Sequence, residues 1–291
     1  MGLQSWLMAQ TYDRVMRKTE QLCLNQWRRE LLTQATGEAL EIGAGTGINL
    51  PHYPADRKLI LCEPDAQMRK QLQKKLAAGT NQQIQITDWT AEQINLPDHS
   101  LDTIISTLVL CSVKDQQQAL KEVYRVLRPG GQLLFMEHVG SEDSRLVRWQ
   151  KLFEPLWRCV CGNCHLTRTT ADNIKANGMV IEQLHESEML GAPAIARRTL
   201  RGRARKPFEI VEDFVPNQDF DLDKTPACPH CQSKDVAKLI YGKPALTRQI
   251  LEGLESGKII SGGCMIHGGA PQWHCNSCRR DFGHLTFDPR R

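Results

Sequence analysis

Three glycines at alternate positions follow a short apolar segment near residue 40. The segment Ala39–Ile42 is typical of a buried strand, and the loop after it reads Gly43-Ala44-Gly45-Thr46-Gly47. Glycine carries no side chain and accepts a left-handed backbone, so such a loop can turn sharply and approach a ligand closely. The spacing is G-x-G-x-G, whereas folds that hold a dinucleotide pyrophosphate use G-x-G-x-x-G. The loop therefore favours a ligand that needs a close backbone and an acidic partner, although an ordinary tight turn would look similar.

An acidic partner stands at the end of the next apolar segment. Leu59–Cys62 is typical of a second strand, and Glu63 and Pro64 follow it directly. Glu63 lies twenty residues after Gly43, a distance that suits one strand–helix–strand unit. A carboxylate at this position can accept hydrogen bonds from both ribose hydroxyls of a nucleoside. The loop and Glu63 together predict a nucleoside-containing cofactor.

Cysteine chemistry is concentrated in the last quarter of the chain. The eleven cysteines include two C-x-x-C turns, Cys228 with Cys231 and Cys275 with Cys278. Two such turns can supply four thiolates to one tetrahedral Zn²⁺. Other residues nearby could be alternative ligands: His230, Cys264, His267 and His274. A separate cluster could hold a metal or act as a redox pair, and the sequence leaves its role open: Cys159, Cys161 and Cys164.

The elements that position the glycine loop alternate between strands and helices. Apolar residues at helical spacing predict a helix over 115–127, which Arg128-Pro129-Gly130-Gly131 ends. Further short apolar segments predict strands over 84–86, 101–107 and 132–136. This alternation indicates an α/β fold with a doubly wound, mostly parallel sheet. Ligands of such sheets bind at the carboxyl ends of the strands.

These residues resemble the cofactor site of the class I S-adenosylmethionine-dependent methyltransferases. A further series is similar to the methyltransferase-like protein seven family of alkyl-thiol S-methyltransferases, over roughly residues 10–200. Its segments are Asn49–Pro54, Thr107–Val113, Glu137–Val139, Trp149-Gln150, Phe153–Pro155, Trp157 and Leu166–Arg168. Quinone-biosynthesis C-methyltransferases are looser relatives, through Ala91-Glu92 and Leu96-Pro97. The resemblance implies a seven-stranded Rossmann-like sheet with S-adenosylmethionine as cofactor.

The resemblance also implies roles for single residues. The expected cofactor-binding residues are Glu41, Gly43, Ala44, Gly45, Thr46, Gly47, Glu63, Pro64, Ala91, Glu92, Thr107 and Leu108. Adenine recognition would fall to Glu92 and neighbouring backbone groups. His138 is the candidate general base because histidine titrates near neutrality, or it only hydrogen-bonds to backbone. Cys111 is expected to pack. A stripe on the helix that precedes the second cysteine cluster is expected to be core, with part of it lining the acceptor pocket: Leu146, Trp149, Phe153 and Trp157.

Charge and composition divide the chain into a methyltransferase domain (1–206), an acidic linker (207–225) and a zinc-ribbon-like domain (226–291), with a net charge of +4. Basic residues gather at Arg197, Arg198, Arg201, Arg203, Arg205 and Lys206. They predict either a solvated tail that pairs with the acidic linker or a basic handle for RNA or anionic lipid. Animal members of the family carry a long apolar N-terminal anchor, but here only a short patch occurs, around Trp6-Leu7-Met8. No run reaches the ~20 apolar residues of a spanning helix, so a cytoplasmic protein is expected.

The expected function is methyl transfer from S-adenosylmethionine to a small acceptor, first a thiol or a similar lipophilic molecule. One alternative is an RNA or protein methyltransferase that docks through the zinc module and the arginine run. Another is a non-catalytic protein that binds zinc and the cofactor. The sequence assigns no partner to the zinc module.

Overall fold

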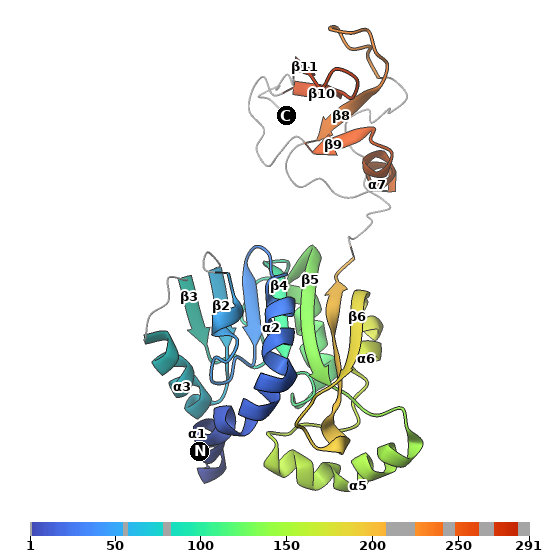
Figure 1. Cartoon of the computed structure of the whole chain (residues 1–291). Coiled ribbons are helices and arrows are strands. Elements are labelled where there is room, and N and C mark those ends of the chain that lie inside the picture. Colours follow the sequence, from blue (N-terminus) through green and yellow to red (C-terminus); the bar gives the residue numbers. More distant parts are fainter. Residues whose placement is uncertain are drawn as a thin grey trace. The chain divides into compact units, whose positions relative to one another are not determined.

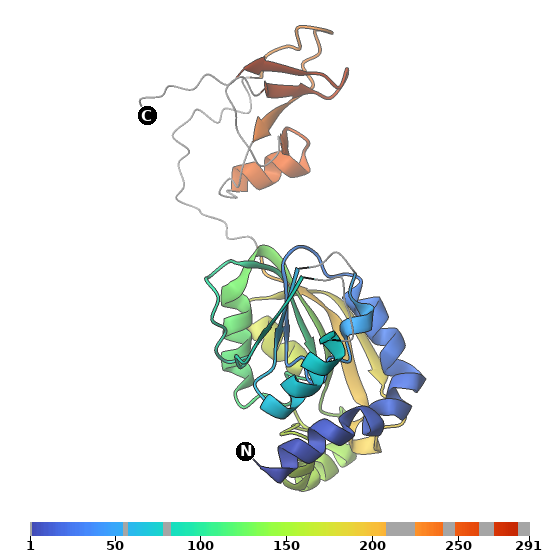
Figure 2. The ribbon, with the colours of Figure 1, turned by 90° about the vertical axis from the view of Figure 1, so that its left-hand side faces the viewer.

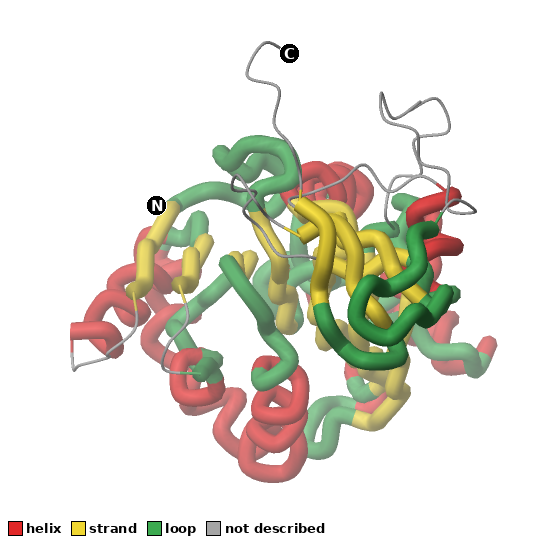
Figure 3. Tube along the Cα trace, turned by 90° about the horizontal axis from the view of Figure 1, so that it is seen from above, coloured by secondary structure: helices red, strands yellow, loops and turns green. Residues whose placement is uncertain are grey.

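The computed structural model describes residues 2–54, 58–77, 83–207, 225–240, 248–261 and 271–284. The chain forms two compact units, Met1–Pro207 and Phe208–Arg291. Each unit contains both helices and strands. Figure 3 colours the helices and strands of the chain by type. The predicted linker at 207–225 lies almost wholly outside the described residues.

The larger unit is built on a seven-stranded sheet in the order β3-β2-β1-β4-β5-β7-β6. The first five strands of this order run parallel, and β7 is antiparallel to both of its neighbours. Figure 1 shows these strands side by side. The strands are β1 (Ala39–Ile42), β2 (Lys58–Cys62), β3 (Gln83–Thr87), β4 (Leu101–Thr107), β5 (Leu127–His138), β6 (Val180–Glu188) and β7 (Arg198–Arg205).

Helices cover both faces of this sheet (Figure 2). Buried side chains of α4 and α6 pack with Leu40, Ile42 and Ile104 on one face, and those of α2 and α3 pack with Leu59, Leu61 and Ile105 on the other. The helices are α1 (Leu3–Thr19), the π-helix η1 (Glu20–Leu24), α2 (Asn25–Leu32), α3 (Ala66–Ala77), α4 (Gln116–Val126), α5 (Ser144–Val160) and α6 (Thr170–Ala176). Two short 3₁₀ turns, η2 (Leu50–His52) and η3 (Ala194–Ala196), complete the unit. The seven-stranded α/β sheet confirms the expected fold class.

The basic run does not form the tail or the free handle that the sequence suggested. Residues 198–205 form β7, between β5 and β6. Arg203 and Arg205 both pair with Glu182, and Arg198 pairs with Glu186; these pairs are diagonal neighbours on the adjacent strands β6 and β7. Lys206 is buried, and its ammonium group donates to the carbonyls of Tyr124 and Leu127.

The stripe on α5 also differs from the expectation of a core. Leu146 and Trp157 are half-buried, but Trp149 is 54% exposed and Phe153 is 42% exposed. Apolar residues at helical spacing indicate an amphipathic helix but do not say what covers it. None of the described helices is both long enough and apolar enough to cross a membrane.

The smaller unit is a four-stranded sheet in the order β11-β10-β8-β9, with one helix. Its elements are β8 (Val236–Ile240), α7 (Arg248–Glu255), β9 (Ile259–Ser261), β10 (Pro271–Cys275) and β11 (Asp281–His284). Helix α7 begins at residue 248, while residues 241–247 lie outside the described part. Cys228, Val236 and Cys275 form the centre of this unit's core, with Trp273 and Phe282 packed against it.

Candidate functional site

The glycine loop leaves β1 in a conformation that needs its glycines. Gly43, Gly45 and Gly47 all have φ between +57° and +80°. A Cβ on Gly43 would lie 2.5 Å from a methyl group of Val109, and one on Gly47 would lie 2.6 Å from Leu72. A Cβ on Gly45 would meet only the carbonyl oxygen of Gly43, at 4.0 Å. The backbone at Gly45 therefore faces open space, where a ligand could approach closely.

Glu63 lies against this loop, as its position after the second strand predicted. Its Oε2 accepts a hydrogen bond from the Gly45 N–H at 2.8 Å, and its Oε1 accepts one from the Asp65 N–H at 2.8 Å. Glu63 is 7% exposed, and burial raises the pKa of its carboxyl group above the ordinary value. Each oxygen of a carboxylate can accept more than one hydrogen bond. Glu63 can therefore hold the loop and still accept from a ligand's hydroxyl groups.

Glu41, at the end of β1, belongs to a buried polar network beneath the loop. Its oxygens accept hydrogen bonds from Asn49 Nδ2 at 2.7 Å and from the Tyr53 hydroxyl at 2.8 Å. Burial raises the pKa of Glu41. Arg28 donates to Asn49 Oδ1 at 2.7 Å and to Thr107 Oγ1 at 3.0 Å. The network thus connects the carboxyl ends of β1 and β4, and both Glu41 and Thr107 are held by protein partners.

A π-helical turn supplies the counter-ion of this network. The guanidinium of Arg28, only 1% exposed, pairs with Glu20 at 3.0 Å. Glu20 opens η1, the five-residue π-helix between α1 and α2. Such turns are rare and are often found at functional sites. No signal in the sequence pointed to Arg28 or Glu20, because their pairing depends on the widened turn and on contacts with distant strands.

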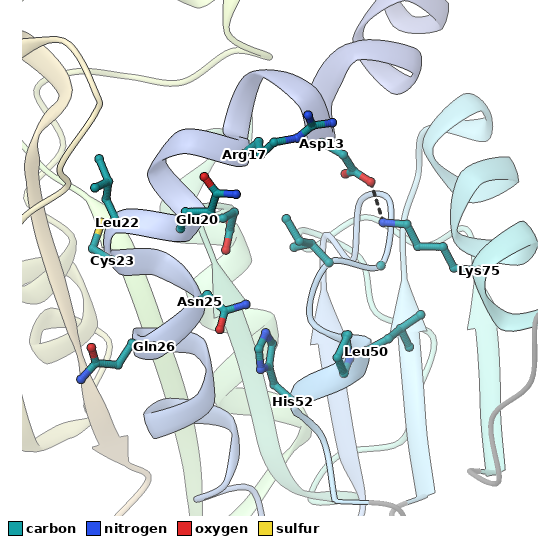
Figure 4. Close-up of a pocket in the computed structure, with 14 residues that line it drawn as sticks. Asp13, Arg17, Glu20, Leu22, Cys23, Asn25, Gln26, Leu50, His52 and Lys75 are labelled. Carbon is teal, nitrogen blue, oxygen red and sulfur yellow. Dashed lines mark hydrogen bonds and ion pairs between the residues drawn. The ribbon is translucent and has the colours of Figure 1, made fainter.

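The N-terminal helix covers the ends of β1 and β2, which the sequence analysis did not foresee. The Ser5 hydroxyl donates to Asp65 Oδ2 at 2.5 Å, and the Thr46 hydroxyl donates to Asp13 Oδ1 at 2.6 Å. Asp13 also pairs with Lys75 of α3 (Figure 4). Helix α1 therefore lies over the glycine loop and over the residues that follow Glu63. Its polar contacts are spaced too irregularly for a pattern to reveal them.

The other residues expected to bind the cofactor lie around the same strand ends. Ala91 is buried, and Leu108 has a left-handed backbone with φ of 61° directly after β4. Glu92 accepts hydrogen bonds from the N–H groups of Lys114 and Asp115, at 2.8 and 3.2 Å, just before α4. The carboxylate of Glu92 is therefore engaged at the start of α4.

A second polar cluster lies at the ends of β4 and β5. His138 is 2% exposed, and its Nδ1 lies 3.6 Å from Cys164 Sγ. Its Nε2 is buried and has no hydrogen-bond partner among the described residues. The pKa of the Cys164 thiol lies well below its ordinary value, mainly because of its hydrogen bond with the Cys111 thiol and, to a smaller extent, because of His138. The same contact with Cys164, and then burial, raises the pKa of Cys111. Cys111 is thus part of a thiol pair as well as a packed residue.

Neighbouring loops enclose this cluster. His165 N–H donates to the Cys111 carbonyl at 2.8 Å, and Asn163 Nδ2 donates to the Ser112 carbonyl at 2.8 Å. One more buried nitrogen in this region, His165 Nε2, has no hydrogen-bond partner in the described part of the chain. Buried polar atoms are normally paired, so the two unpaired imidazole nitrogens of His138 and His165 indicate a site for a polar ligand.

An open cavity of about 960 Å³ lies between η1, η2 and α3 (Figure 4). It shares Gly47 with the predicted cofactor residues but none of the others, and Arg17, Glu20 and His52 are among its lining residues. It therefore lies beside the glycine loop and does not coincide with the region near Glu63.

The four predicted zinc ligands are brought together in the smaller unit. The sulfur atoms of Cys228, Cys231, Cys275 and Cys278 all lie within 4.8 Å of one another. The closest pairs are 3.5 and 3.6 Å apart. Sulfur atoms on a tetrahedral Zn²⁺ at 2.3 Å would lie about 3.8 Å apart, so the arrangement fits this ion. Among the described residues no other group of three or more potential ligands is this compact, and Cys159, Cys161 and Cys164 form no such site.

The two cysteine turns have equivalent backbones. The N–H of Gln232 donates to the Cys228 carbonyl, and the N–H of Arg279 donates to the Cys275 carbonyl, both at 2.8 Å. Gln232 and Arg279 each have a left-handed backbone, with φ of 60° and 55°. Of the alternative ligands, His274 pairs with Asp281 at 2.6 Å, and Cys264 and His267 lie outside the described residues.

Comparison with known proteins adds an independent line of evidence. A family profile described as a methyltransferase domain matches residues 40–135. Thiol S-methyltransferase TMT1B of Rattus norvegicus is 36% identical over 176 residues, which cover 60% of this chain and 72% of the rat protein. Human thiol S-methyltransferase TMT1A is 39% identical over 132 residues, or 44% of this chain and 54% of that protein.

A more distant relative and a solved structure are also methyltransferases. A ubiquinone/menaquinone biosynthesis C-methyltransferase of Hahella chejuensis is 33% identical over 123 residues, covering 38% of this chain and 48% of its own. A crystal structure of an S-adenosylmethionine-dependent methyltransferase of Thermotoga maritima superposes with a TM-score of 0.52 at 21% identity, covering 71% of this chain and all of that chain. This last likeness shows a shared fold.

Proposed function

The chain belongs to the family of S-adenosylmethionine-dependent methyltransferases that includes the mammalian thiol S-methyltransferases, and we propose that it methylates the sulfur of a small thiol. The observation that carries this proposal is the cluster of His138, Cys164 and Cys111 beside the expected cofactor site. It offers a buried proton acceptor in a region where the buried Nε2 of His165 also has no described partner. The thiol names of relatives at 36% to 40% identity support the choice of acceptor.

The cofactor would occupy the carboxyl ends of β1, β2 and β4. We assign its close backbone contact to Gly45, where the loop faces open space, and its ribose to Glu63, whose oxygens already line the loop. Ala44, Thr46, Pro64, Ala91 and Leu108 belong to the same rim. Glu41 and Thr107 would support this rim through Asn49 and Arg28. Glu92 is less suited to adenine than the sequence suggested, because its carboxylate is already engaged at α4.

When bound, the cofactor supplies an electrophilic methyl group on a sulfonium, which departs as a thioether when the acceptor sulfur attacks. The chain's own contribution is to position the acceptor and to take its proton. We assign the proton to His138 Nε2. The anionic Cys164 at Nδ1 then stabilises the imidazolium that forms, as an acidic partner does for other catalytic histidines. A free thiol has a pKa of about 8.5, so only modest assistance is needed near neutral pH.

The test uses full-length protein, methyl-labelled cofactor and a panel of small alkyl thiols, quinols and RNA. We expect thioether product from the thiols, at a rate that falls in His138→Gln because that variant lacks the proposed proton acceptor. Cys159→Ser, at an exposed cysteine of the neighbouring cluster, is the matched control and should keep the wild-type rate. Methylation of RNA or a quinol without methylation of any thiol would refute the proposed acceptor.

We also propose that Cys228, Cys231, Cys275 and Cys278 hold one structural Zn²⁺. Four thiolates and no exchangeable ligand are typical of structural zinc, so the ion would stabilise the smaller unit and take no part in methyl transfer. RNA docking through the arginine run is less favoured, because Arg203 and Arg205 of β7 pair with a glutamate and so are less available to phosphate groups.

A further inference from the structure

Helix α5 exposes more apolar surface than a helix in water normally does. Five large side chains on it are between 42% and 66% exposed: Trp149, Leu152, Phe153, Leu156 and Val160. Their spacing of three and four residues places them on one side of the helix, here called the α5 face. The rings of Trp149 and Phe153 stack on each other, with centroids 5.7 Å apart. Contiguous exposed apolar patches of this kind indicate a binding surface.

The other side of α5, here called the committed side, contacts the rest of the larger unit. Gln150 is buried, and its side chain bonds to the Ser141 N–H and to the Ile195 carbonyl. Glu154 accepts from Thr167 at 2.8 Å and lies 3.2 Å from His165 Nδ1. The helix is therefore fixed in orientation, and the α5 face points away from the body of the unit.

Charged residues beside the α5 face have one sign. The exposed charged side chains within α5 are Arg145, Arg148, Lys151 and Arg158, and the helix's one acid is Glu154, on the committed side. None of these four cations forms an ion pair with an acidic residue in the described part of the chain. The acids Glu142 and Asp143 lie just before the helix; Glu142 pairs with Arg198, and Asp143 caps α5.

Helix α1 extends this surface. Trp6 is 48% exposed and Leu7 is 46% exposed. Gln4 donates to the carbonyl of Cys159, at the end of α5, and Met8 lies beside Gly162 just after it. Figures 1 and 2 both show α1 and α5 at the same end of the sheet. Two helices that touch each other thus expose tryptophan and leucine at one end of the unit.

We propose that the α5 face, with Trp6 and Leu7 of α1, docks on the surface of an anionic lipid bilayer. Exposed aromatic and leucine side chains flanked by cations are the composition of helices that lie in the membrane interface. The helix would lie along the surface, in keeping with the finding that no described helix can cross a membrane. A symmetric dimer through this face is disfavoured, because it would bring the same four cations of each copy together. The proposal does not depend on which acceptor is methylated.

The experiment measures sedimentation of the full chain with vesicles of phosphatidylcholine alone or of phosphatidylcholine with phosphatidylglycerol. We expect binding to the anionic vesicles that weakens as salt is added. The variant with Arg148→Gln and Lys151→Gln should bind these vesicles about 25-fold more weakly, since each cation near such a surface contributes about a factor of five. Its control, Lys121→Gln with Lys175→Gln, removes the same charge from α4 and α6 and should bind as the wild type does.

The apolar contribution is tested separately. Leu152→Ser with Leu156→Ser should weaken vesicle binding by about tenfold or more, because both side chains would otherwise leave water. Val180→Ser on β6, whose side chain is 56% exposed, is the matched control and should have no effect. Wild-type protein that does not bind anionic vesicles, or both test variants binding as their controls do, would overturn the proposal. So would a dimer in sedimentation velocity that only Leu152→Ser with Leu156→Ser abolishes, since the face would then bind a second copy.

Discussion

The two units of this chain keep their candidate sites in place by different means. In the larger unit, apolar side chains fill both faces of a seven-stranded sheet, and the glycine loop leaves the end of a fully buried strand. In the smaller unit, two of the three residues at the centre of the core, Cys228 and Cys275, are themselves candidate metal ligands. We therefore expect the larger unit to fold before it binds anything, and the smaller one to depend on the zinc ion proposed for its four cysteines.

The difference shows where buried polar groups can be maintained. The larger unit buries an arginine, three glutamates and an asparagine near the ends of its strands, and each has a hydrogen-bond partner. Such a network costs desolvation, which extensive apolar burial can offset. Among the described residues of the smaller unit, the apolar cluster around Cys228 and Cys275 is small, and its candidate site consists of four thiols. The following predictions are arranged from the largest expected effect to the smallest.

Removal of the metal should have the largest effect, and only on one unit. Cys231→Ser, or extraction of zinc with a chelator, should unfold the smaller unit, because structural zinc contributes about 10–16 kcal/mol of apparent binding free energy in small zinc domains. Calorimetry should show the loss of one transition while the larger unit melts as before and still binds the cofactor. Zinc content is measured alongside by elemental analysis.

The control for this prediction is Cys159→Ser, which removes an exposed thiol of the larger unit. It should leave both transitions and the zinc content unchanged. Protein that contains no zinc when purified without chelator would contradict the prediction. Loss of cofactor binding in Cys231→Ser would contradict the independence of the two units.

Breaking the buried ion pair should have the next largest effect, on the larger unit alone. Arg28→Met leaves Glu20 without its counter-ion, and Asn49 and Thr107 each lose the hydrogen bond that Arg28 donates to them. The expected loss is about 3–5 kcal/mol of the larger unit's stability. Arg29→Met, an exposed neighbour on the same helix, is the control and should change stability little. Equal melting of both variants would show that the network does not support the unit.

Sequence patterns predicted the parts of the larger unit that depend on local features. The strands β1, β2 and β4 are short apolar runs, and the glycines indicate a left-handed loop, so the strands and the loop could be predicted. The pairing of Arg28 with Glu20 and Asn49 depends on a π-helical turn and on contacts across the fold, for which no local pattern exists. The α5 stripe was misjudged because its spacing fits a core as well as an exposed face. The hairpin of β6 and β7 was not predicted strand by strand, since both strands carry many charged residues and neither contains an apolar run.

Replacing Glu63 should have an intermediate effect that concerns binding. Glu63→Ala removes the acceptor for the Gly45 N–H and the proposed acceptor for the ribose, so cofactor affinity should fall by about 1.5–3 kcal/mol in calorimetric titration. Glu92→Ala is the matched comparison. It should lower stability by about 1 kcal/mol through the start of α4 and leave affinity nearly unchanged. If Glu92→Ala lowered cofactor affinity and Glu63→Ala did not, Glu92 rather than Glu63 would bind the cofactor.

The smallest effect is expected at the paired arginines of β7, and it should depend on pH. Arg203→Gln with Arg205→Gln removes both cations that hold Glu182, at a cost of about 1 kcal/mol or less because the pairs are partly exposed. Arg205 lowers the pKa of Glu182 below its ordinary value. The pairs therefore stabilise the folded chain above the unfolded pKa of about 4.3, and this contribution disappears as the pH falls through the lower, folded value. Urea unfolding should separate wild type and variant at pH 7 and bring them together near pH 3. A difference that persisted at low pH would mean that the arginine side chains contribute through packing on the sheet, independently of their charge.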